Sequence, residues 1–182
     1  MLSIRVICVG KYKEQFYADA ADEYIKRLGG HCRLEIVEIP EYRIEAGCTG
    51  SAKYAINNSQ LTVGRKDLKN NSAQVETALD KERAAIVKKL PVGAKVIALC
   101  IEGREYDSQG LSELLMNFAG SGSSRLCFII GGSFGLHEEL KNMADVKLSM
   151  SKMTFPHNLA RVMLLEQLYR AFKIAEGGKY HK

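Results

Sequence analysis

The chain has 182 residues, 46% of them hydrophobic, which is enough for one substantial core but too few for two independent domains. Its 26 Lys and Arg residues against 21 Asp and Glu give a formal charge of +5, a balance that only mildly favours polyanionic partners. The apolar run Leu2–Val9 is too short for a signal peptide or a membrane span, so we expect a single cytoplasmic domain without a membrane partner.

Hydrophobic periodicity predicts strands and helices that alternate along the chain. In chain order we expect a strand over 2–9, a helix over 14–28, a strand over 32–39, a helix over 72–90, a strand over 95–101, a helix over 108–119, a strand over 125–130, a helix over 137–143, a strand over 146–150 and a helix over 157–174. The nearly unbroken apolar runs within this series are typical of strands buried on both faces. The sequence therefore predicts an α/β fold with a mainly parallel sheet between helices.

The stretch Tyr42–Asn71 differs from its surroundings, because it is rich in Asn, Gly, Ser and Lys and has only short apolar pieces such as Leu61–Val63. A structureless loop of that length is unusual inside a compact domain, so we expect a surface loop or a small hairpin inserted into the fold. Ser72 and Ser108 each suit the N-cap position of the helix that they open.

The five cysteines are isolated from one another, with no CxxC pair and no histidine at the spacing of zinc ligands. Four of them lie in apolar runs that are typical of strands. We expect small core residues in a reducing compartment, and neither disulfides nor a metal site. The residues are Cys8, Cys32, Cys48, Cys100 and Cys127.

The last helix has apolar residues that do not form one stripe when they are projected at ~100° per residue. Because they spread around most of the circumference, this helix must be covered on more than one side. Either it is central to the monomer or it packs against another subunit, and in so short a chain we favour a homodimer interface. The residues are Leu159, Val162, Met163, Leu164, Leu165, Leu168, Ala171 and Phe172.

The turn Gly131–Gly135, of sequence GGSFG, follows a buried strand and precedes a helix, the place where open α/β sheets bind ligands. It matches neither the GxGxxG fingerprint nor the P-loop, so its spacing suits a plain tight turn as well as a ligand loop. The next segment, Ser149–His157, alternates small hydroxyls with large apolar side chains. The structural interpretation is the end of a strand followed by the start of a helix, with Pro156 in the first helical turn. The functional interpretation is a pocket lined by backbone that holds an adenine between apolar walls.

The end of the chain, 176–182, holds two glycines and then an aromatic, an imidazole and two ammonium groups. Chain ends are usually without a role. In the functional alternative, Tyr180 stacks on a base while Lys179 and Lys182 contact phosphates. No carboxylate pair and no Ser-His-Asp set is evident, which argues against a hydrolase.

Three segments taken together resemble a known family. They are IIGGSFGL at Ile129–Leu136, SMSKMTFPH at Ser149–His157, and ARVMLLEQLYRAFKI at Ala160–Ile174 with a terminal YHK. The combination closely resembles the SPOUT-class ribosomal RNA large subunit methyltransferase H family, which methylates N3 of a pseudouridine in 23S rRNA. The match also takes in VGKYK and ALCIEGRE, so it covers nearly the whole chain except the stretch 42–71.

This resemblance implies one SPOUT domain over 1–182 with a C-terminal trefoil knot, a feature so rare that no spacing argument would predict it. It implies that S-adenosylmethionine, the methyl donor, binds in the knot without a metal. By position, the pocket would be formed by Leu99, Gly131, Gly132, Ser151, Lys152, Met153, Thr154, Phe155 and Pro156.

The resemblance also implies a homodimer formed by the last helix, in which the tail 176–182 of one subunit completes the site of the other. The substrate would be 23S rRNA in the assembled ribosome. Two features depart from the family pattern. The stretch 42–71 is longer than in typical members, and Ala175–Gly178 replaces an Arg-Gly-Glu type sequence, which removes a positive charge that could contact a phosphate.

The sulfonium of this donor is already reactive, so the enzyme must chiefly hold the methyl carbon ~3–3.5 Å from the nucleophilic nitrogen and in line with the leaving sulfur. The imide N–H of the base must also lose its proton, which requires a base or groups that stabilise the developing anion. Imidazole and guanidinium groups suit these tasks. The candidates, among which the sequence does not decide, are His157, Arg161, Arg170, Tyr180 and His181.

Three alternatives stay open at this point. One is a SPOUT methyltransferase that acts on tRNA, with the same donor site and another substrate. Another is a non-catalytic ribosome-binding module, which the intact glycine turn and the SKMTFP segment argue against. A flavodoxin-like binder of small molecules is supported by the order of strands and helices alone.

Overall fold

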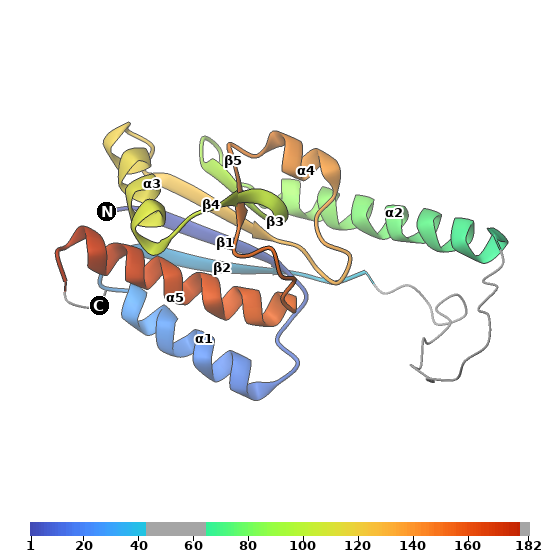
Figure 1. Ribbon diagram of the computed structural model, residues 1–182, viewed down its shortest axis with the longest axis horizontal. Helices are drawn as coiled ribbons and strands as arrows, with labels where there is room; N and C mark the ends of the chain where they lie inside the picture. Colours follow the sequence, from blue (N-terminus) through green and yellow to red (C-terminus); the bar gives the residue numbers. More distant parts are fainter. Residues whose placement is uncertain (43–64, 179–182) are drawn as a thin grey trace.

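The fold was obtained as a computed structural model, which describes residues 1–42 and 65–178. Strands and helices alternate throughout these residues (Figure 1). They are β1 (Ser3–Val9), α1 (Gln15–Leu28), β2 (Arg33–Ile39), α2 (Arg65–Val87), β3 (Lys95–Glu105), α3 (Ser108–Gly120), β4 (Arg125–Ile130), α4 (Glu138–Met143), β5 (Val146–Ser149) and α5 (His157–Ala175).

The strands form one sheet in the order β2-β1-β4-β3-β5, and every neighbouring pair is parallel. In the middle of the sheet Val6 of β1 lies opposite Ile36 of β2 and Phe128 of β4. The predicted α/β fold with a parallel sheet between helices is therefore confirmed. Because all the strands run the same way, their carboxyl ends meet at one edge of the sheet, where ligands bind in such folds.

Helices cover both faces of the sheet (Figure 1). The molecule has one hydrophobic core on each face of the sheet, and successive side chains of β1 point alternately into one and the other, as in any pleated strand. Ile4, Val6 and Cys8 belong to the core beneath α1, α3 and α5, whereas Ile7 and Val9 belong to the core beneath α2 and α4. Burial on both faces explains why these strands read as unbroken apolar runs.

Helix α5 packs on the sheet between α1 and α3. Leu164, Leu165 and Leu168 are fully buried, and every residue from 157 to 174 is at least partly buried. The helix is thus central to the monomer, which was one of the two alternatives. Leu159 and Met163 remain partly exposed, so a surface for a partner is still available on it.

The structure corrects the predicted start of α2. This helix begins at Arg65, inside the stretch that was predicted to be a loop or hairpin, so Ser72 lies within the helix and does not cap it. Arg65–Leu68 are mostly good helix formers, whereas the polar residues Asn70 and Asn71 suggested a loop. The remainder of the predicted insertion, 43–64, lies outside the described residues.

Two smaller differences also have physical causes. The N-cap of α3 is Asp107, whose carboxylate accepts a hydrogen bond of 2.7 Å from the backbone N–H of Gly110, so Ser108 is the first helical residue. Strand β3 continues past its predicted end to Glu105, because it pairs with β5 a second time: Leu148 lies opposite both Leu99 and Arg104.

Among the described cysteines, Cys8, Cys32 and Cys127 are buried core residues, as predicted, and Cys100 is partly exposed; all four are free thiols. Burial raises the pKa of Cys127 to about 12, so this thiol stays protonated at neutral pH. Cys48 lies outside the described residues. In the part of the chain that the structure describes, no helix is both long and apolar enough to cross a membrane.

Candidate functional site

A pocket of about 860 Å³ opens at the carboxyl edge of the sheet. Its walls come from three segments: the later part of β3 at 99–102, the turn after β4 at 130–136, and the connection from β5 to α5 at 148–157. These are segments that carry the family resemblance. The walls are mostly backbone and apolar side chains, and the volume is typical of a small-molecule site.

The glycines of the turn Gly131–Gly135 are required by its own packing. A Cβ atom at Gly131 would lie 2.2 Å from the carbonyl oxygen of Gly135, and one at Gly132 would lie 2.8 Å from Cγ1 of Val9. Gly135 has a φ of +80°, in the left-handed region that favours glycine. The turn is therefore a tight turn that also forms a wall of the pocket, and its role as a ligand loop stays a prediction.

Glu41, two residues after the end of β2, holds this turn from outside the pocket. Its Oε1 atom accepts a hydrogen bond of 3.2 Å from the backbone N–H of Ser133 and one of 2.5 Å from the Ser133 hydroxyl. The hydroxyl bond is the main reason that the pKa of Glu41 lies below its usual value, and the charges of His157 and Lys13 add to the effect against the opposing effect of burial. Sequence reasoning missed Glu41, because its partner is 92 residues away.

The connection from β5 to α5 is held by local hydrogen bonds. The Ser149 hydroxyl donates to the carbonyl oxygen of Ser151 at 3.0 Å, and the backbone N–H of Met153 donates to the Ser151 hydroxyl at 3.0 Å. Lys152 is exposed and does not line the pocket. The predicted donor-binding residues that do line it are Leu99, Gly131, Gly132, Ser151, Met153, Thr154, Phe155 and Pro156.

His157 borders the pocket at the first residue of α5. Its Nε2 atom is buried, makes no hydrogen bond with the described residues, and lies next to Gly10, where an added Cβ would be 3.4 Å away. Of the predicted catalytic residues within the described part of the chain, His157 alone reaches this pocket.

Arg161 lies one turn further along α5 and does not line the pocket. Its side chain is 1% exposed, and its Nη2 atom donates a hydrogen bond of 2.6 Å to Glu38 Oε1. The guanidinium carbon lies 4.0 Å from the ring centroid of Tyr12, a cation–π contact. These three residues border a separate cavity of about 380 Å³. Arg161 thus lies outside the larger pocket, and its Nε and Nη1 atoms are buried without a hydrogen-bond partner among the described residues. A catalytic role for Arg161 stays a prediction.

Arg170 does not line the pocket either. Arg170 pairs with Glu166 at 2.5 Å, and it follows His157 by 13 residues of helix, about 20 Å at 1.5 Å per residue. Tyr180 and His181 lie outside the described residues. The sequence resemblance thus identified most of the pocket wall, but it did not separate residues at the pocket from residues elsewhere on the same helix.

Solved structures with a similar fold are methyltransferases by title. A probable methyltransferase from Bordetella pertussis Tohama I superposes with a TM-score of 0.54 at 14% identity, over 94% of this chain and 95% of that one. A probable methylase family protein from Haemophilus influenzae Rd KW20 superposes with a TM-score of 0.53 at 14% identity, over 100% of this chain and 72% of that one. At such identities the likeness concerns the fold.

Sequence similarity extends over the whole chain. Ribosomal RNA large subunit methyltransferase H 1 of Clostridium perfringens is 41% identical over 181 residues that cover 100% of both chains. The ribosomal RNA large subunit methyltransferase H of Acetivibrio thermocellus is 38% identical with the same coverage. The family model described as "Predicted SPOUT methyltransferase" matches residues 2–181. The chain therefore belongs to the SPOUT methyltransferases, in the family of ribosomal RNA large subunit methyltransferase H.

Proposed function

We propose that this protein methylates large-subunit rRNA, with S-adenosylmethionine as the donor and N3 of a pseudouridine in 23S rRNA as the acceptor. The observation that carries the proposal is that three segments that match the family, 99–102, 130–136 and 148–157, line one cavity of about 860 Å³. The relatives are named for rRNA methylation, and the base and atom come from the family resemblance.

The pocket suits the proposed donor, which joins a flat apolar base to a charged amino-acid part. Leu99, Leu148 and Phe155 provide apolar walls, while Glu102 and Lys141 bring charge to the lining. When bound, the donor supplies a methyl group on a reactive sulfonium. The residues of the pocket then have mainly a positioning task, and orientation alone can account for a large part of a rate enhancement.

The acceptor's imide proton needs a group near the mouth of the pocket. His157 borders the pocket, but its Nε2 atom is closed off within the monomer. We propose that the chain's tail supplies the group that contacts the target base, with His181 or Tyr180 in that role. Gly177 and Gly178 precede these residues, and Gly177, with a φ of +70°, turns the chain away from the end of α5.

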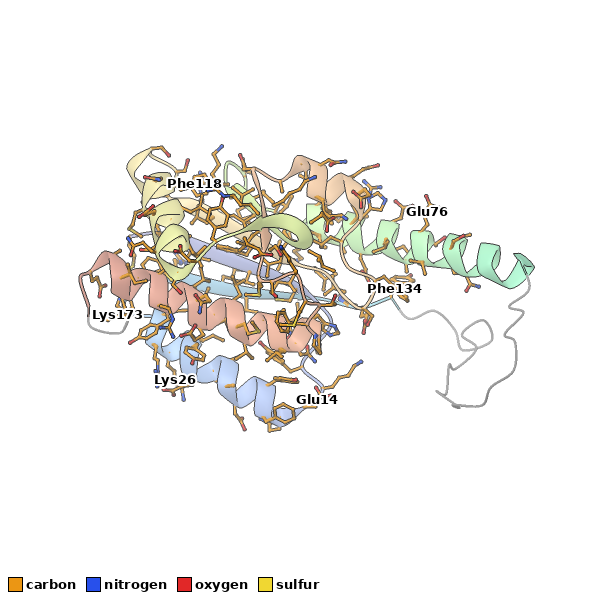
Figure 2. The ribbon with its side chains drawn as sticks, viewed as in Figure 1. Glu14, Lys26, Glu76, Phe118, Phe134 and Lys173 are labelled. Atoms are coloured by element: carbon orange, nitrogen blue, oxygen red, sulfur yellow. The ribbon has the colours of Figure 1, made fainter. Side chains whose placement is uncertain are left out.

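The described end of the chain lies far from the pocket of the same chain. Helix α5 begins at the pocket and runs for 19 residues, about 28 Å, to the opposite end of the molecule. Figure 2 shows Phe134 of the glycine turn and Lys173 near the end of α5 at these two ends. There Glu176 contacts His31 at 2.5 Å, and the four residues after Gly178 span at most about 14 Å.

The tail therefore supports a homodimer in which it serves the site of the partner. The partly exposed apolar residues of α5, Leu159 and Met163, and Met153 at 68% exposure, give a second copy an apolar surface close to the pocket. We propose that this surface forms the dimer and that the protein acts in the cytoplasm on the assembled ribosome, where the rRNA surface is complete.

The trefoil knot implied by the family is also part of this proposal. Its support is the unusual closeness of β3 and β5 beyond their first pairing. An added Cβ at Gly103 would lie 2.7 Å from the backbone carbons of Lys147 and Leu148, and Leu148 pairs with β3 at two places. The later half of β3 thus lies directly against the backbone of β5.

Transfer of labelled methyl from S-adenosylmethionine tests the proposal. The acceptors are ribosomes that lack the modification, free 23S rRNA and bulk tRNA. We expect label in the 23S rRNA of intact ribosomes and much less in the other two. Label in tRNA would support the alternative substrate, and donor binding without transfer to any acceptor would support a non-catalytic ribosome-binding module.

Subunit complementation tests the dimer. A chain with Gly131→Val and a chain that lacks 180–182 should each be inactive, because each lacks one half of the shared site. A mixed dimer of the two should recover transfer, since one of its two sites has an intact pocket and an intact tail. A mixed dimer that forms from folded chains but transfers no methyl group would contradict a site shared between subunits.

A further inference from the structure

The carboxylate of Glu41 lies where several loops of the carboxyl edge meet. It accepts two hydrogen bonds from Ser133 in the glycine turn, and Lys13 of the β1–α1 loop lies 3.9 Å from its Oε2 atom. The charge of His157, at the start of α5, lowers the pKa of Glu41 as well. One side chain thus contacts the glycine turn, which lines the pocket, and the neighbouring β1–α1 loop, and it is influenced by the charge at the start of α5.

The glycine turn needs an anchor of this kind. Gly131, Gly132 and Gly135 allow its close packing but supply no side chain that could hold it, and glycine has more backbone freedom than any other residue. Within the described residues, both hydrogen bonds made by Ser133 go to Glu41. Hydrogen bonds to an ionised carboxylate are roughly twice as strong as neutral ones.

Glu41 is itself held in place from the other face of the sheet. The backbone N–H of the next residue, Tyr42, donates a hydrogen bond of 2.9 Å to Glu82 of α2, and Lys81 Nζ lies 4.1 Å from the centroid of the Tyr42 ring. The Glu41 side chain is 15% exposed. Its position is therefore fixed before any ligand arrives, as a supporting residue of a binding site requires.

We propose that Glu41 is a positioning residue that keeps the glycine turn in its ligand-binding shape and thereby sets the affinity for the methyl donor. The inference rests on the proposed function, because it takes the donor as the ligand of the pocket. Glu41 does not itself line the pocket. Its effect therefore falls on donor binding and not on the methyl-transfer step.

Calorimetric titration with S-adenosylhomocysteine and the steady-state kinetics of methyl transfer test the inference. Glu41→Ala should weaken binding about tenfold and raise KM for the donor to a similar extent, with kcat within about twofold. Glu41→Gln should bind within about threefold of the wild type, because its amide oxygen still accepts from Ser133. The control is Glu35→Ala, on strand β2 before Glu41, which removes an ion pair of 2.7 Å with Arg5 away from the pocket and should change neither donor affinity nor KM.

A double-mutant cycle with Ser133→Ala gives the second measurement. If the two residues act through one contact, the pair Glu41→Ala and Ser133→Ala should bind no more weakly than Glu41→Ala alone. Unchanged affinity in Glu41→Ala, or a fall in kcat with unchanged KM, would overturn the inference and leave the proposed function intact. A wild type that does not bind S-adenosylhomocysteine would instead overturn the proposed function, and the inference with it.

Discussion

Two cavities flank the first turns of α5, and they differ in the segments that line them. The larger one, which His157 borders, is mostly apolar and is lined by residues of the motif segments Ile129–Leu136 and Ser149–His157. The smaller one is lined by no residue of these two segments and contains Arg161, whose side chain is 1% exposed, paired with Glu38 and stacked on Tyr12. We therefore propose that the donor binds in the first cavity and that Arg161, in the second, mainly stabilises the fold.

The largest effect should come from closing the first cavity. Gly131→Ala places a Cβ atom 2.2 Å from the carbonyl oxygen of Gly135, so the turn must open, and S-adenosylhomocysteine binding should fall more than about 100-fold, roughly 2.7 kcal/mol or more. The control is Gly120→Ala at the end of α3, where nothing lies within 4 Å of the added atom. Calorimetry that finds equal affinities in the two variants would contradict the assigned pocket.

The next effect concerns the second cavity. Arg161→Met removes the partner of Glu38, whose side chain is 33% exposed, so the loss of unfolding free energy should lie between the about 1 kcal/mol of an exposed ion pair and the about 3 kcal/mol of a buried one. Urea unfolding should show this loss, and Glu38→Leu added to Arg161→Met should recover part of it. Donor affinity should stay within about threefold of the wild type in the double variant. A stable Arg161→Met protein that binds the donor but transfers no methyl group would instead make Arg161 a catalytic residue.

Thiol labelling compares the two cavities within one protein. Cys100 lines the first cavity and is partly exposed, whereas Cys8 lies beside Arg161, and burial raises its pKa to about 12. Alkylation at mildly alkaline pH, mapped by mass spectrometry, should modify Cys100 and leave Cys8 untouched. Saturating S-adenosylhomocysteine should slow the modification of Cys100 several-fold. Equal rates with and without this ligand would place the ligand elsewhere.

The smallest effect is the pH dependence of the Glu41 anchor. The pKa of Glu41 is lower in the folded protein than its ordinary value of 4.5, chiefly through the Ser133 hydroxyl. The stability that ionised Glu41 contributes is therefore complete above pH 4.5 and is lost as the pH falls through the lower folded value. The difference in unfolding free energy between the wild type and Glu41→Gln should be below about 1.5 kcal/mol at pH 7 and should shrink as the pH falls below 4.5 through the lower folded pKa. A difference that does not shrink in acid would show that the ionised carboxylate is not its source.

Hydrophobic patterns along the chain predicted the fold well. Strands that are buried on both faces of the sheet have almost uninterrupted apolar sequences, of which Arg125–Ile130 is an example. The family motifs predicted most of the pocket wall. What they missed depends on contacts between distant residues. Glu41 follows a strand without any motif, and Arg161 shares a helix face with His157 but is covered by Tyr12. The start of α2 was missed because local composition in 65–71 resembles a loop.

The most direct test of the central claim is hydrogen exchange with and without S-adenosylhomocysteine. We predict that the ligand slows amide exchange in 99–102, 131–136 and 149–157, and leaves exchange around Glu38 and Tyr12 unchanged. Protection of the Glu38 and Tyr12 region instead, or no protection in the glycine turn, would contradict the assignment of donor binding to the first cavity.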